Sequence, residues 1–327
     1  MRQFTVSPSE AGMRITRFVE KATSGFPRTL LHKAFRNRRI KINGKRAQSE
    51  DLLRAGDIVE LYINDEFFRA DKSFYFTSEN AVSDTVSRQL TAIFEDEGLA
   101  ILHKPAGLLS HSGENGGENL LDTYIQRLIV QKQYLPEAEN TFRPALCNRL
   151  DRNTEGLVVV AKTHAALAGM NMLIRQGYIG KDYRCICLGE AIGGTYEAFL
   201  SRNLHTKKVV VMKEQAEGSK KIITRLQPLA SAKELSLCEA ELITGRTHQL
   251  RAHMAFLGWP LLGDGKYGNA AVNRRFGLAY QCLCAHTLRF SETIPSDNPL
   301  AYLAGRVFSL QQCDVDEQWQ RLNGLGS

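Results

Sequence analysis

The sequence has no apolar run approaching the roughly 20 residues that a membrane-spanning helix requires. Residues 1–8 also lack the apolar core of a secretory signal. Without an export signal, the seven cysteines are typical of free thiols in a reducing compartment. These absences predict a cytoplasmic protein that has no membrane partner. The length of 327 residues and the apolar content of 43% allow one large domain and a small one with a substantial core.

Acidic residues are missing between Arg28 and Arg46, a segment that contains eight lysines and arginines. Its charge of +8 exceeds the formal +7 of the whole chain, so the other 308 residues carry a net charge of −1. Such a block is typical of a polyanion contact, because neutralising phosphates releases counterions and favours binding. The alternative is a solvated, charge-rich surface. The eight residues are Arg28, Lys33, Arg36, Arg38, Arg39, Lys41, Lys45 and Arg46.

Residues 12–63 have the pattern of a small folded module with this charge on one face. Apolar residues at helical spacing predict two helices, which Gly25-Phe26-Pro27 separates. Asn43-Gly44 is a strong signal for a tight turn after a short strand. The expected elements are helices at 15–22 and 28–35 and strands at 40–42 and 58–62.

Residues 64–88 are polar and are interpreted as a linker to a second domain, at 89–320. Strands and helices follow one another there without the regular spacing of parallel βαβ units, which favours an α+β fold over a doubly wound sheet. Strands are expected at 92–94, 99–102, 145–150, 157–161, 183–188, 208–212, 221–226 and 237–243, and helices from residue 120 and at 164–175.

Asp151 lies at the end of an apolar run, with Arg149 and Arg152 on either side. A carboxylate at the edge of a buried strand is usually paired or used, and the flanking guanidinium groups favour its ionised form. One interpretation is a turn held by a structural Arg–Asp pair, and the other is a catalytic carboxylate. Lys181 and Tyr183 form a second cluster, since they point to the same side of a predicted strand start.

A third polar cluster lies at residues 244–253. Gly245 ends a predicted strand there, and Thr247 is expected to cap a helix. Arg251 follows four residues later on a similar helix face. His248 is near that face as well, and a lone helix histidine is more often packed than catalytic.

Other motifs fail on their context. Gly263–Gly268 satisfies G-x-G-x-x-G, but it follows no clear first strand, and no acid about 20 residues on supports a dinucleotide site. Cys185-x-Cys187 and Cys282-x-Cys284 lack the usual zinc spacing, and free cysteines on strands pack as small apolar residues. The sequence also contains no serine nucleophile elbow.

Residues 12–63 resemble the S4 RNA-binding domain, which implies docking onto structured RNA. The residues that carry the resemblance are Arg28-Thr29-Leu30-Leu31, Ile40-Lys41-Ile42-Asn43-Gly44-Lys45 and Leu53-Arg54-Ala55-Gly56-Asp57-Ile58-Val59.

Residues 90–290 resemble the RluA-type pseudouridine synthases of the RluC and RluD kind, in the order and spacing of five motifs. The matching segments are Lys104-Pro105-Ala106-Gly107, Asn148–Gly156 (against H-R-L-D-R-x-T-S-G), Lys181-Asp182-Tyr183, Gly245–Arg251 (against G-R-[TS]-H-Q-[LI]-R) and Gly263-Asp264 with Tyr267-Gly268. Two positions depart from the family pattern: Asn148 replaces a histidine and is expected to hydrogen-bond the neighbouring loop, and Glu155 replaces a serine.

This resemblance implies an α+β catalytic domain with a mixed, largely antiparallel sheet, and isomerisation of uridine to pseudouridine in RNA without a cofactor or metal. It implies that Asp151 is the catalytic carboxylate and that Arg251 pairs with it. Tyr183 would offer a ring for the flipped uracil and a hydroxyl near the sugar.

The same resemblance assigns substrate contacts. Arg149 would fill the gap left in the RNA or contact a phosphate, and Lys181 and Arg246 would hold structure or backbone phosphates. The basic module favours large-subunit ribosomal RNA as the partner of a monomeric enzyme. The alternatives are a tRNA pseudouridine synthase and a non-catalytic RNA-binding or ribosome-assembly factor, for which the changes at Asn148 and Glu155 are the best support.

Overall fold

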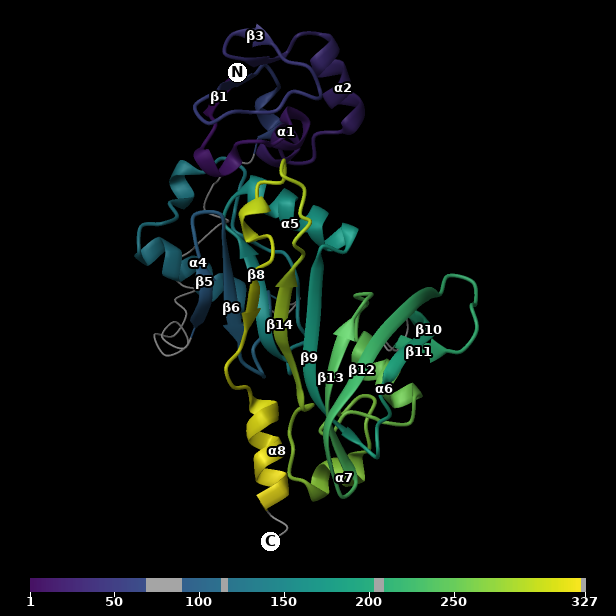
Figure 1. The fold of residues 1–327 in the computed structure, drawn as a ribbon. Coiled ribbons are helices and arrows are strands. Elements are labelled where there is room, and N and C mark those ends of the chain that lie inside the picture. The colour runs from purple at the N-terminus through teal and green to yellow at the C-terminus, as the bar shows by residue number, and fades with distance from the viewer. Residues whose placement is uncertain (69–89, 113–116, 203–208, 325–327) are drawn as a thin grey trace.

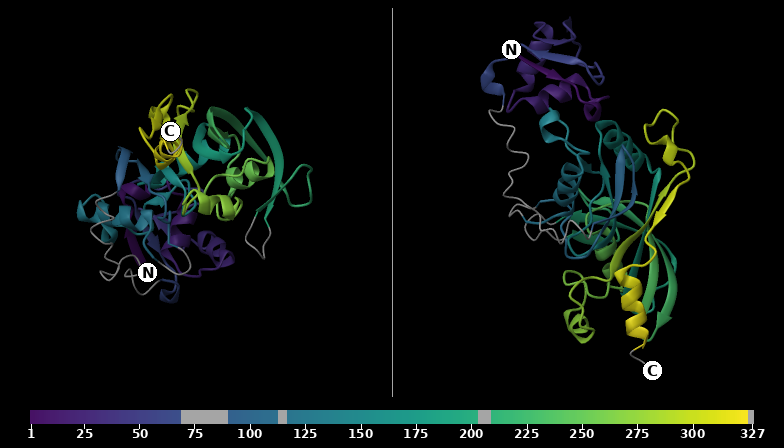
Figure 2. Two further views of the ribbon diagram at one scale, coloured as in Figure 1. Left: turned by 90° about the horizontal axis from the view of Figure 1, so that it is seen from below. Right: turned by 90° about the vertical axis from the view of Figure 1, so that its left-hand side faces the viewer.

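The computed structural model describes residues 1–68, 90–112, 117–202 and 209–324. It contains two separate β-sheets, one in an N-terminal module and one in a larger domain, and the two chain ends lie at opposite ends of the molecule (Figure 1; Figure 2). Most of the predicted linker, residues 69–88, lies outside the described residues. In the described part of the chain, no helix combines the length and the apolar character that crossing a membrane requires.

The N-terminal module packs two helices against a four-stranded antiparallel sheet. Its elements are β1 (Arg2–Thr5), η1 (Pro8–Glu10), α1 (Ile15–Ala22), α2 (Arg28–Arg36), β2 (Ile40–Ile42), β3 (Lys45–Arg46), β4 (Ile58–Leu61) and η2 (Asp65–Phe67). The strand order is β1-β4-β2-β3. Phe18 and Val19 of α1 are fully buried, as their helical spacing predicts. Asn43 and Gly44 join β2 to β3 with positive φ angles of 51° and 76°, the conformation that the predicted tight turn requires.

Glu10 fastens the module to the larger domain. Its side chain is fully buried, and its Oε1 accepts hydrogen bonds from the backbone N–H of Thr141 (2.5 Å) and the Thr141 hydroxyl (2.8 Å). Oε2 accepts from the side-chain amide of Asn140 (2.9 Å) and from the backbone N–H of Ser7 (3.0 Å). Because every bond to a buried carboxylate offsets its desolvation, this contact fixes the module at one end of the larger domain.

The larger domain is built on a sheet of eleven described strands. Its elements are β5 (Thr91–Glu95), β6 (Leu99–Lys104), α4 (Leu120–Val130), η5 (Pro136–Ala138), β7 (Ala145–Leu146), β8 (Glu155–Ala161), α5 (His164–Gln176), β9 (Ile179–Leu188), β10 (Gly194–Arg202), β11 (Val209–Met212), β12 (Lys220–Ala232), β13 (Leu235–Leu242), α6 (Gln249–Phe256), α7 (Ala270–Arg275), β14 (Leu283–Phe290), η6 (Ala301–Leu303), β15 (Val307–Ser309) and α8 (Asp314–Gly324).

The strand order of this sheet is β11-β10-β12-β13-β9-β14-β8-β6-β5, with β15 added beside β14 and β7 beside β8. Among the described pairings, β8 with β14 is parallel and the others are antiparallel. The expected α+β class with a mixed, largely antiparallel sheet is therefore confirmed.

Strand β8 is buried on both faces, because its alternate side chains enter two different cores. Leu157 and Val159 pack in the cluster that contains α5, whereas Val158 and Val160 pack in the cluster that contains α4. A strand clamped in this way gives the residues that precede it a rigid support.

The strand expected at 145–150 is wrong in length, since only Ala145–Leu146 form β7. The reason is the side chain of Asn148, whose Oδ1 accepts from the backbone N–H of Val159 (2.7 Å) and whose amide donates to the Leu157 carbonyl (3.2 Å). The Asn148 side chain thus makes the hydrogen bonds to β8 that the backbone of a longer β7 would make, so the backbone leaves the sheet after Cys147. Asn148 thus bonds strand β8 and not the neighbouring loop.

Candidate active site

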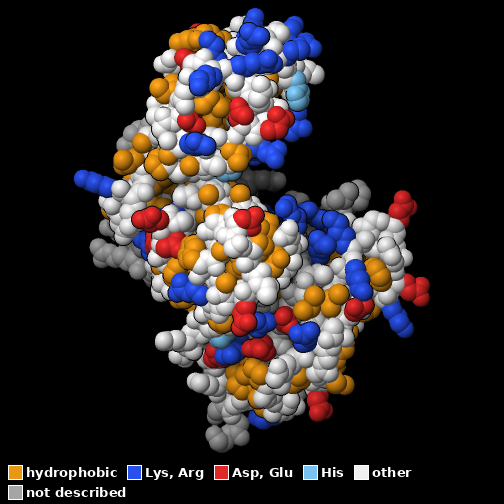
Figure 3. Space-filling model, turned by 45° about the horizontal axis from the view of Figure 1, so that its top comes forward, with side chains coloured by type: hydrophobic (Ala, Val, Ile, Leu, Met, Phe, Trp, Pro, Cys, Tyr) orange, Lys and Arg blue, Asp and Glu red, His pale blue; other side chains and the backbone are white. Residues whose placement is uncertain are grey.

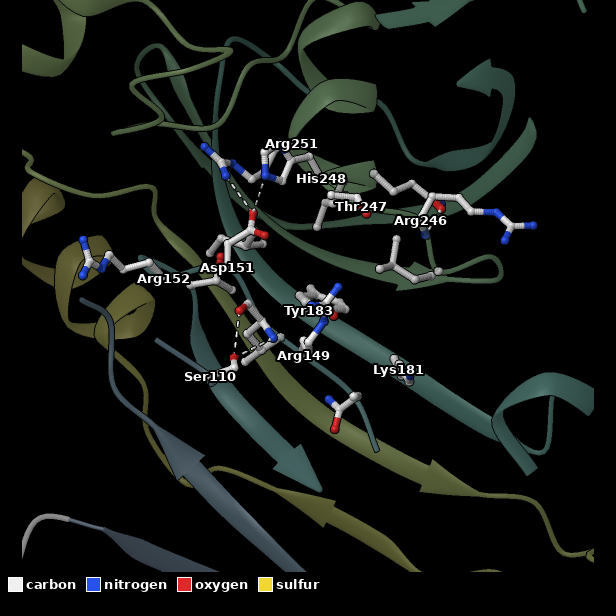
Figure 4. A pocket seen from close by; sticks show the side chains of 18 of the residues that line it. Ser110, Arg149, Asp151, Arg152, Lys181, Tyr183, Arg246, Thr247, His248 and Arg251 are labelled. Atoms are coloured by element: carbon white, nitrogen blue, oxygen red, sulfur yellow. Dashed lines mark hydrogen bonds and ion pairs between the residues drawn. The ribbon is translucent and has the colours of Figure 1, made fainter. Parts of the chain in front are cut away.

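A pocket of about 510 Å³ opens in the larger domain where three segments meet. The loop between β7 and β8 contributes Asp151, β9 contributes Tyr183, and α6 contributes Arg251. These side chains lie around one space in Figure 4. Asp151 and Arg251 are 100 residues apart in the sequence, so the tertiary fold alone brings them together.

Arg251 links Asp151 to a second carboxylate, that of Asp264. Its Nη1 donates to Asp151 Oδ2 at 2.7 Å, while Nε and Nη2 donate to Asp264 Oδ2 and Oδ1 at 2.7 and 2.9 Å. Asp264 is fully buried, whereas the side chain of Asp151 is 29% exposed. The buried carboxylate therefore holds the guanidinium in a fixed orientation, and the guanidinium orients the carboxylate that faces the pocket.

The charged groups of this network stabilise one another in the ionised form. Burial lowers the pKa of Arg251, but the hydrogen bonds and charges of Asp264 and Asp151 outweigh burial and raise that pKa above its ordinary value. Burial raises the pKa of Asp264, but its bonds to Arg251 and to backbone N–H groups outweigh this and lower it. Both groups are thus ionised near neutral pH.

The loop that carries Asp151 is held on both sides. The Ser110 hydroxyl donates to the carbonyl of Leu150 at 2.8 Å and accepts from its N–H at 3.1 Å (Figure 4). The ammonium of Lys104 donates to the carbonyl of Arg152 at 3.0 Å. Lys104 is fully buried, and burial lowers its pKa to about 8. A catalytic group on a loop needs such fixed supports to hold its geometry.

Tyr183 and Lys181 both line the pocket, as their alternation on one strand predicts. Burial, and after it the charge of Asp151, raises the pKa of Tyr183, so its hydroxyl stays protonated at neutral pH. Burial lowers the pKa of Lys181. The wall opposite Asp151 therefore offers a neutral aromatic hydroxyl and a partly desolvated amine.

Arg149 and Arg246 lie at the exposed rim of the same pocket. Nη1 of Arg149 is 2.8 Å from Nε2 of His111, which keeps the guanidinium on the solvent side. The structure thus brings all six residues expected in the catalytic domain to one pocket.

The basic segment of the N-terminal module does not reach this pocket, since none of its eight cations is among the lining residues. Seven of them are exposed, and the ammonium of Lys41 lies 5.0 Å from the ring centroid of Tyr62. Figure 3 shows Lys and Arg side chains gathered along the outer edge of the module. The module presents a cationic surface of its own.

The expected helix cap at Thr247 is wrong. Helix α6 begins at Gln249, and the residue before it is His248, which has a left-handed φ of 54°. The Gln249 side chain causes this start, because its Oε1 accepts from the Thr244 hydroxyl (2.9 Å) and the Arg246 N–H (3.1 Å). Thr247 remains exposed beside the pocket.

Glu155, the second departure from the family pattern, has structural partners behind the pocket. Its Oε1 is 2.8 Å from Nε2 of His103, and its Oε2 accepts from the backbone N–H of Asp314 at 2.8 Å, at the start of α8. A carboxylate at a helix N-terminus is favourable, because it satisfies a free N–H group and opposes the positive end of the helix dipole. Glu155 therefore docks the C-terminal helix and leaves Asp151 unchanged as the pocket's carboxylate.

One group of potential metal ligands occurs in the part of the chain that the structure describes. Atoms of Glu155, Cys284 and Cys313 lie within 4.8 Å of one another. The carboxylate is already bonded to His103 and Asp314, and the Cys313 thiol donates to Asp316 at 3.2 Å. The Glu155 and Cys313 groups therefore have partners without a metal, and none of the three residues lines the pocket of Asp151.

Sequence reasoning assigned no role to Asp264 or Lys104, although both lie in recognised motif segments. Asp264 follows Gly263 in the loop between α6 and α7, and a buried acid next to a positive-φ glycine is a signal of a specific contact. Lys104 ends strand β6, and a lysine at a strand end is ordinarily solvated. Its burial depends on three carbonyl acceptors, those of Pro105, Leu108 and Arg152, which only the folded loops bring together.

Comparison with known proteins shows which family the chain resembles. A family model described as RNA pseudouridylate synthase matches residues 98–256. The chain is 30% identical over 308 residues to the ribosomal large subunit pseudouridine synthase C of Yersinia pestis, covering 90% of this chain and 91% of the relative. It is 29% identical over 297 residues to the protein of the same name from Haemophilus influenzae (strain ATCC 51907 / DSM 11121 / KW20 / Rd), covering 89% and 87%.

A solved structure shares the fold. Human RNA Pseudouridylate Synthase Domain Containing 4 superposes with a TM-score of 0.57 at 22% identity, covering 73% of this chain and 96% of that one. The sequence likeness to the Yersinia pestis relative, along most of both chains, decides the family. The chain belongs to the RNA pseudouridylate synthase family and is a pseudouridine synthase of the RluA type.

Proposed function

We propose that this enzyme isomerises uridines of large-subunit ribosomal RNA, with Asp151 as the catalytic carboxylate. The observation that carries the proposal is the hydrogen-bonded series of side chains Asp264–Arg251–Asp151. It orients one partly exposed carboxylate toward a pocket that is large enough for a flipped nucleotide. The target class is supported by the relatives in Yersinia pestis and Haemophilus influenzae, whose names state that they act on the ribosomal large subunit.

In the proposed reaction the target nucleotide leaves its stack and enters the pocket, at a cost of a few kcal/mol. Asp151 then acts as a nucleophile at C1′ or as a base on the ribose, and the N1–C1′ bond breaks. The uracil turns and C5 bonds to C1′, while the Asp151–C1′ bond breaks or, in the base route, Asp151 returns the proton to the ribose. The proton on C5 is lost and N1 gains one. Atoms and electrons balance within the nucleotide, because the product is an isomer of the substrate.

The remaining pocket residues are proposed to bind different parts of the RNA. Tyr183 supplies a ring on which the uracil stacks and a neutral hydroxyl near the sugar. Arg149 at the rim fills the gap left in the RNA or contacts a phosphate. Lys181 and Arg246 hold the pocket wall and backbone phosphates.

The N-terminal module is proposed to be an S4-type RNA-binding domain, at residues 12–63. Its exposed cations, which are seven of the eight between Arg28 and Arg46, would contact phosphates of structured RNA. The buried contact of Glu10 with Thr141 keeps this surface in a constant position relative to the pocket. RNA bound to the module would therefore reach Asp151 in a defined register.

The experiment uses bacterial RNA that lacks pseudouridine and maps the positions that the full-length enzyme modifies. We expect modification in large-subunit ribosomal RNA by the wild type and none by Asp151→Asn, because the amide cannot act as a nucleophile or base. Glu197→Gln is the matched control, since Glu197 is an exposed acid on β10 outside the pocket. Modification confined to tRNA would refute the proposed target, and activity in Asp151→Asn would refute the catalytic role.

A further inference from the structure

His248 adopts a strained backbone conformation that its helix does not require. Its φ of 54° lies in the left-handed region, which costs a non-glycine residue roughly 1–2 kcal/mol. Its side chain makes no capping bond to α6. Strain of this kind persists where the surrounding structure needs the side chain in one place. Here the place is the pocket, in which the ring lies beside Asp151 (Figure 4).

The two ring nitrogens of His248 face different partners. Nε2 is 3.6 Å from Oδ2 of Asp151, the same oxygen that receives the Arg251 bond. Nδ1 is 2.9 Å from the hydroxyl of Tyr267. The two rings meet edge to face, with centroids 5.6 Å apart. The separation from Asp151 is slightly longer than a hydrogen bond, as is common for catalytic contacts before the substrate binds.

The contacts of Tyr267 favour one of the two positions for the ring proton of His248. The Tyr267 hydroxyl accepts a hydrogen bond from the backbone N–H of Val209 at 3.2 Å. Among the described residues, Nδ1 is the acceptor that lies within hydrogen-bond distance of the Tyr267 hydroxyl, so the hydroxyl proton is placed on that bond. Burial raises the pKa of Tyr267, so this proton is retained at neutral pH. In neutral His248 the remaining proton is therefore on Nε2, which points at Asp151.

The groups around His248 keep the ring neutral near pH 7. Burial lowers its pKa most, the charge of Asp151 raises it, Arg251 and Lys266 lower it, and Asp264 raises it, with a net lowering from the ordinary 6.5. A neutral N–H group can orient a carboxylate without adding a second full cation beside it. The carboxylate then stays a better nucleophile than one held by two cations.

We propose that His248 is a positioning residue of this enzyme, which presents a neutral Nε2–H group to Oδ2 of Asp151 while Tyr267 fixes the tautomer. The proposal rests on the proposed catalytic role of Asp151. Arg251 and His248 approach the same oxygen, so the other oxygen of the carboxylate is left facing the nucleotide. The hydrogen bond to Asp151 closes when the substrate fills the pocket.

The test compares His248→Gln with His248→Ala in the full-length enzyme. Both replacements carry a Cβ and face the same backbone strain, but only glutamine places a neutral N–H group near the position of Nε2. The readouts are the single-turnover rate between pH 5 and 8 and the affinity for RNA, on an RNA that the wild type modifies. We expect His248→Ala to lose roughly tenfold to a hundredfold in rate with unchanged affinity, and His248→Gln to retain most of the rate.

The pH profile separates this role from a structural one. Protonation of His248 adds a cation and turns Nδ1 into a donor that opposes the Tyr267 hydroxyl, so the wild-type rate should fall as the pH drops below 6.5. Glutamine does not titrate, so this acid limb should disappear in His248→Gln. Equal losses in the two His248 variants, or an acid limb that persists in His248→Gln, would overturn the proposal.

Tyr267→Phe provides an independent variant that keeps the ring packing and removes only the hydroxyl. We expect Tyr267→Phe alone to lose a few fold in rate. The double variant Tyr267→Phe/His248→Gln should have the same rate as His248→Gln, because both residues act through one contact. Additive losses would overturn the proposal even if His248→Ala fails to fold. Failure of the proposed function has a different signature, since it shows as activity in Asp151→Asn or as a wild type that modifies no RNA.

Discussion

Replacing Asp264 with asparagine should destabilise the larger domain and slow the reaction together. Asp264 is fully buried and accepts four hydrogen bonds, two from Arg251 and two from the backbone N–H groups of Lys266 and Tyr267. Asparagine fills the same volume but removes the charge and turns an NH2 group toward the donors of Arg251. Breaking a buried ion pair on one side costs about 3–5 kcal/mol. Because Arg251 keeps Asp151 as a partner, we expect about 3 kcal/mol.

The assay is urea unfolding followed by tryptophan fluorescence, which reports on the larger domain alone. The two tryptophans, Trp259 and Trp319, both pack against cores of that domain. The matched control is Glu197→Gln, which breaks an exposed pair with Lys221 whose N–O distance is 2.7 Å. An exposed pair contributes at most about 1 kcal/mol, so the control should scarcely move the midpoint.

Asp264→Asn should also slow the reaction, because it changes how the carboxylate of Asp151 is oriented. With Asp264 neutral, Arg251 is no longer held from behind, and its bond to Asp151 loses its fixed direction. We expect kcat to fall at least about tenfold, the equivalent of about 1.4 kcal/mol, with unchanged RNA affinity. The reasoning is refuted if Asp264→Asn unfolds within 1 kcal/mol of the control or retains the wild-type kcat.

Three further predictions concern other parts of the molecule. Lys104→Met should lower kcat without weakening RNA binding, because the carbonyl of Arg152 loses its donor; a change in RNA affinity with normal kcat would contradict this. Burial lowers the pKa of His253 to about 4, so between pH 6.5 and 4 the unfolded chain takes up a proton that the native chain does not. The contribution of His253 to the free energy of unfolding is therefore full above pH 6.5 and should fall by roughly 2 kcal/mol toward pH 4, allowing for solvent screening. Urea midpoints measured across this pH range should lack that decrease in His253→Gln. Changing Arg38 and Arg46 to glutamine should reduce the slope of log affinity against log salt by about 2, measured by RNA binding at several salt concentrations, and an unchanged slope would remove these cations from the RNA contact.

Within residues 12–63 the local structure followed closely from short-range signals, whereas β1, which pairs with β4, was not expected. The spacing of Phe18 and Val19 placed the apolar face of α1, and Asn43-Gly44 placed the turn between β2 and β3. Such signals act within a few residues, so the sequence contains them in readable form. The larger sheet was less readable, since strands such as β9 and β12 run beyond the ranges expected for them.

Two further boundaries were wrong because nearby side chains took over backbone hydrogen bonds. Asn148 bonds the backbone of β8 and ends β7 early. Gln249 bonds Arg246 and Thr244 and moves the start of α6 past Thr247. In each case a side-chain bond within about a dozen residues decided the boundary, and the apolar pattern does not show which side chains make such bonds.

The sequence by itself determined the residues of the site: an aspartate between two arginines, a tyrosine on a strand and an arginine on a helix, in motifs that resemble one enzyme family. It also determined the separate basic surface, because charge is a property of composition. Only the tertiary structure decided how these residues are connected. The placement of Asp264 behind Arg251, of Lys104 beneath the loop of Asp151 and of His248 beside that carboxylate depends on contacts between segments far apart in the chain. Local spacing cannot encode such contacts, because the packing of the whole sheet fixes them.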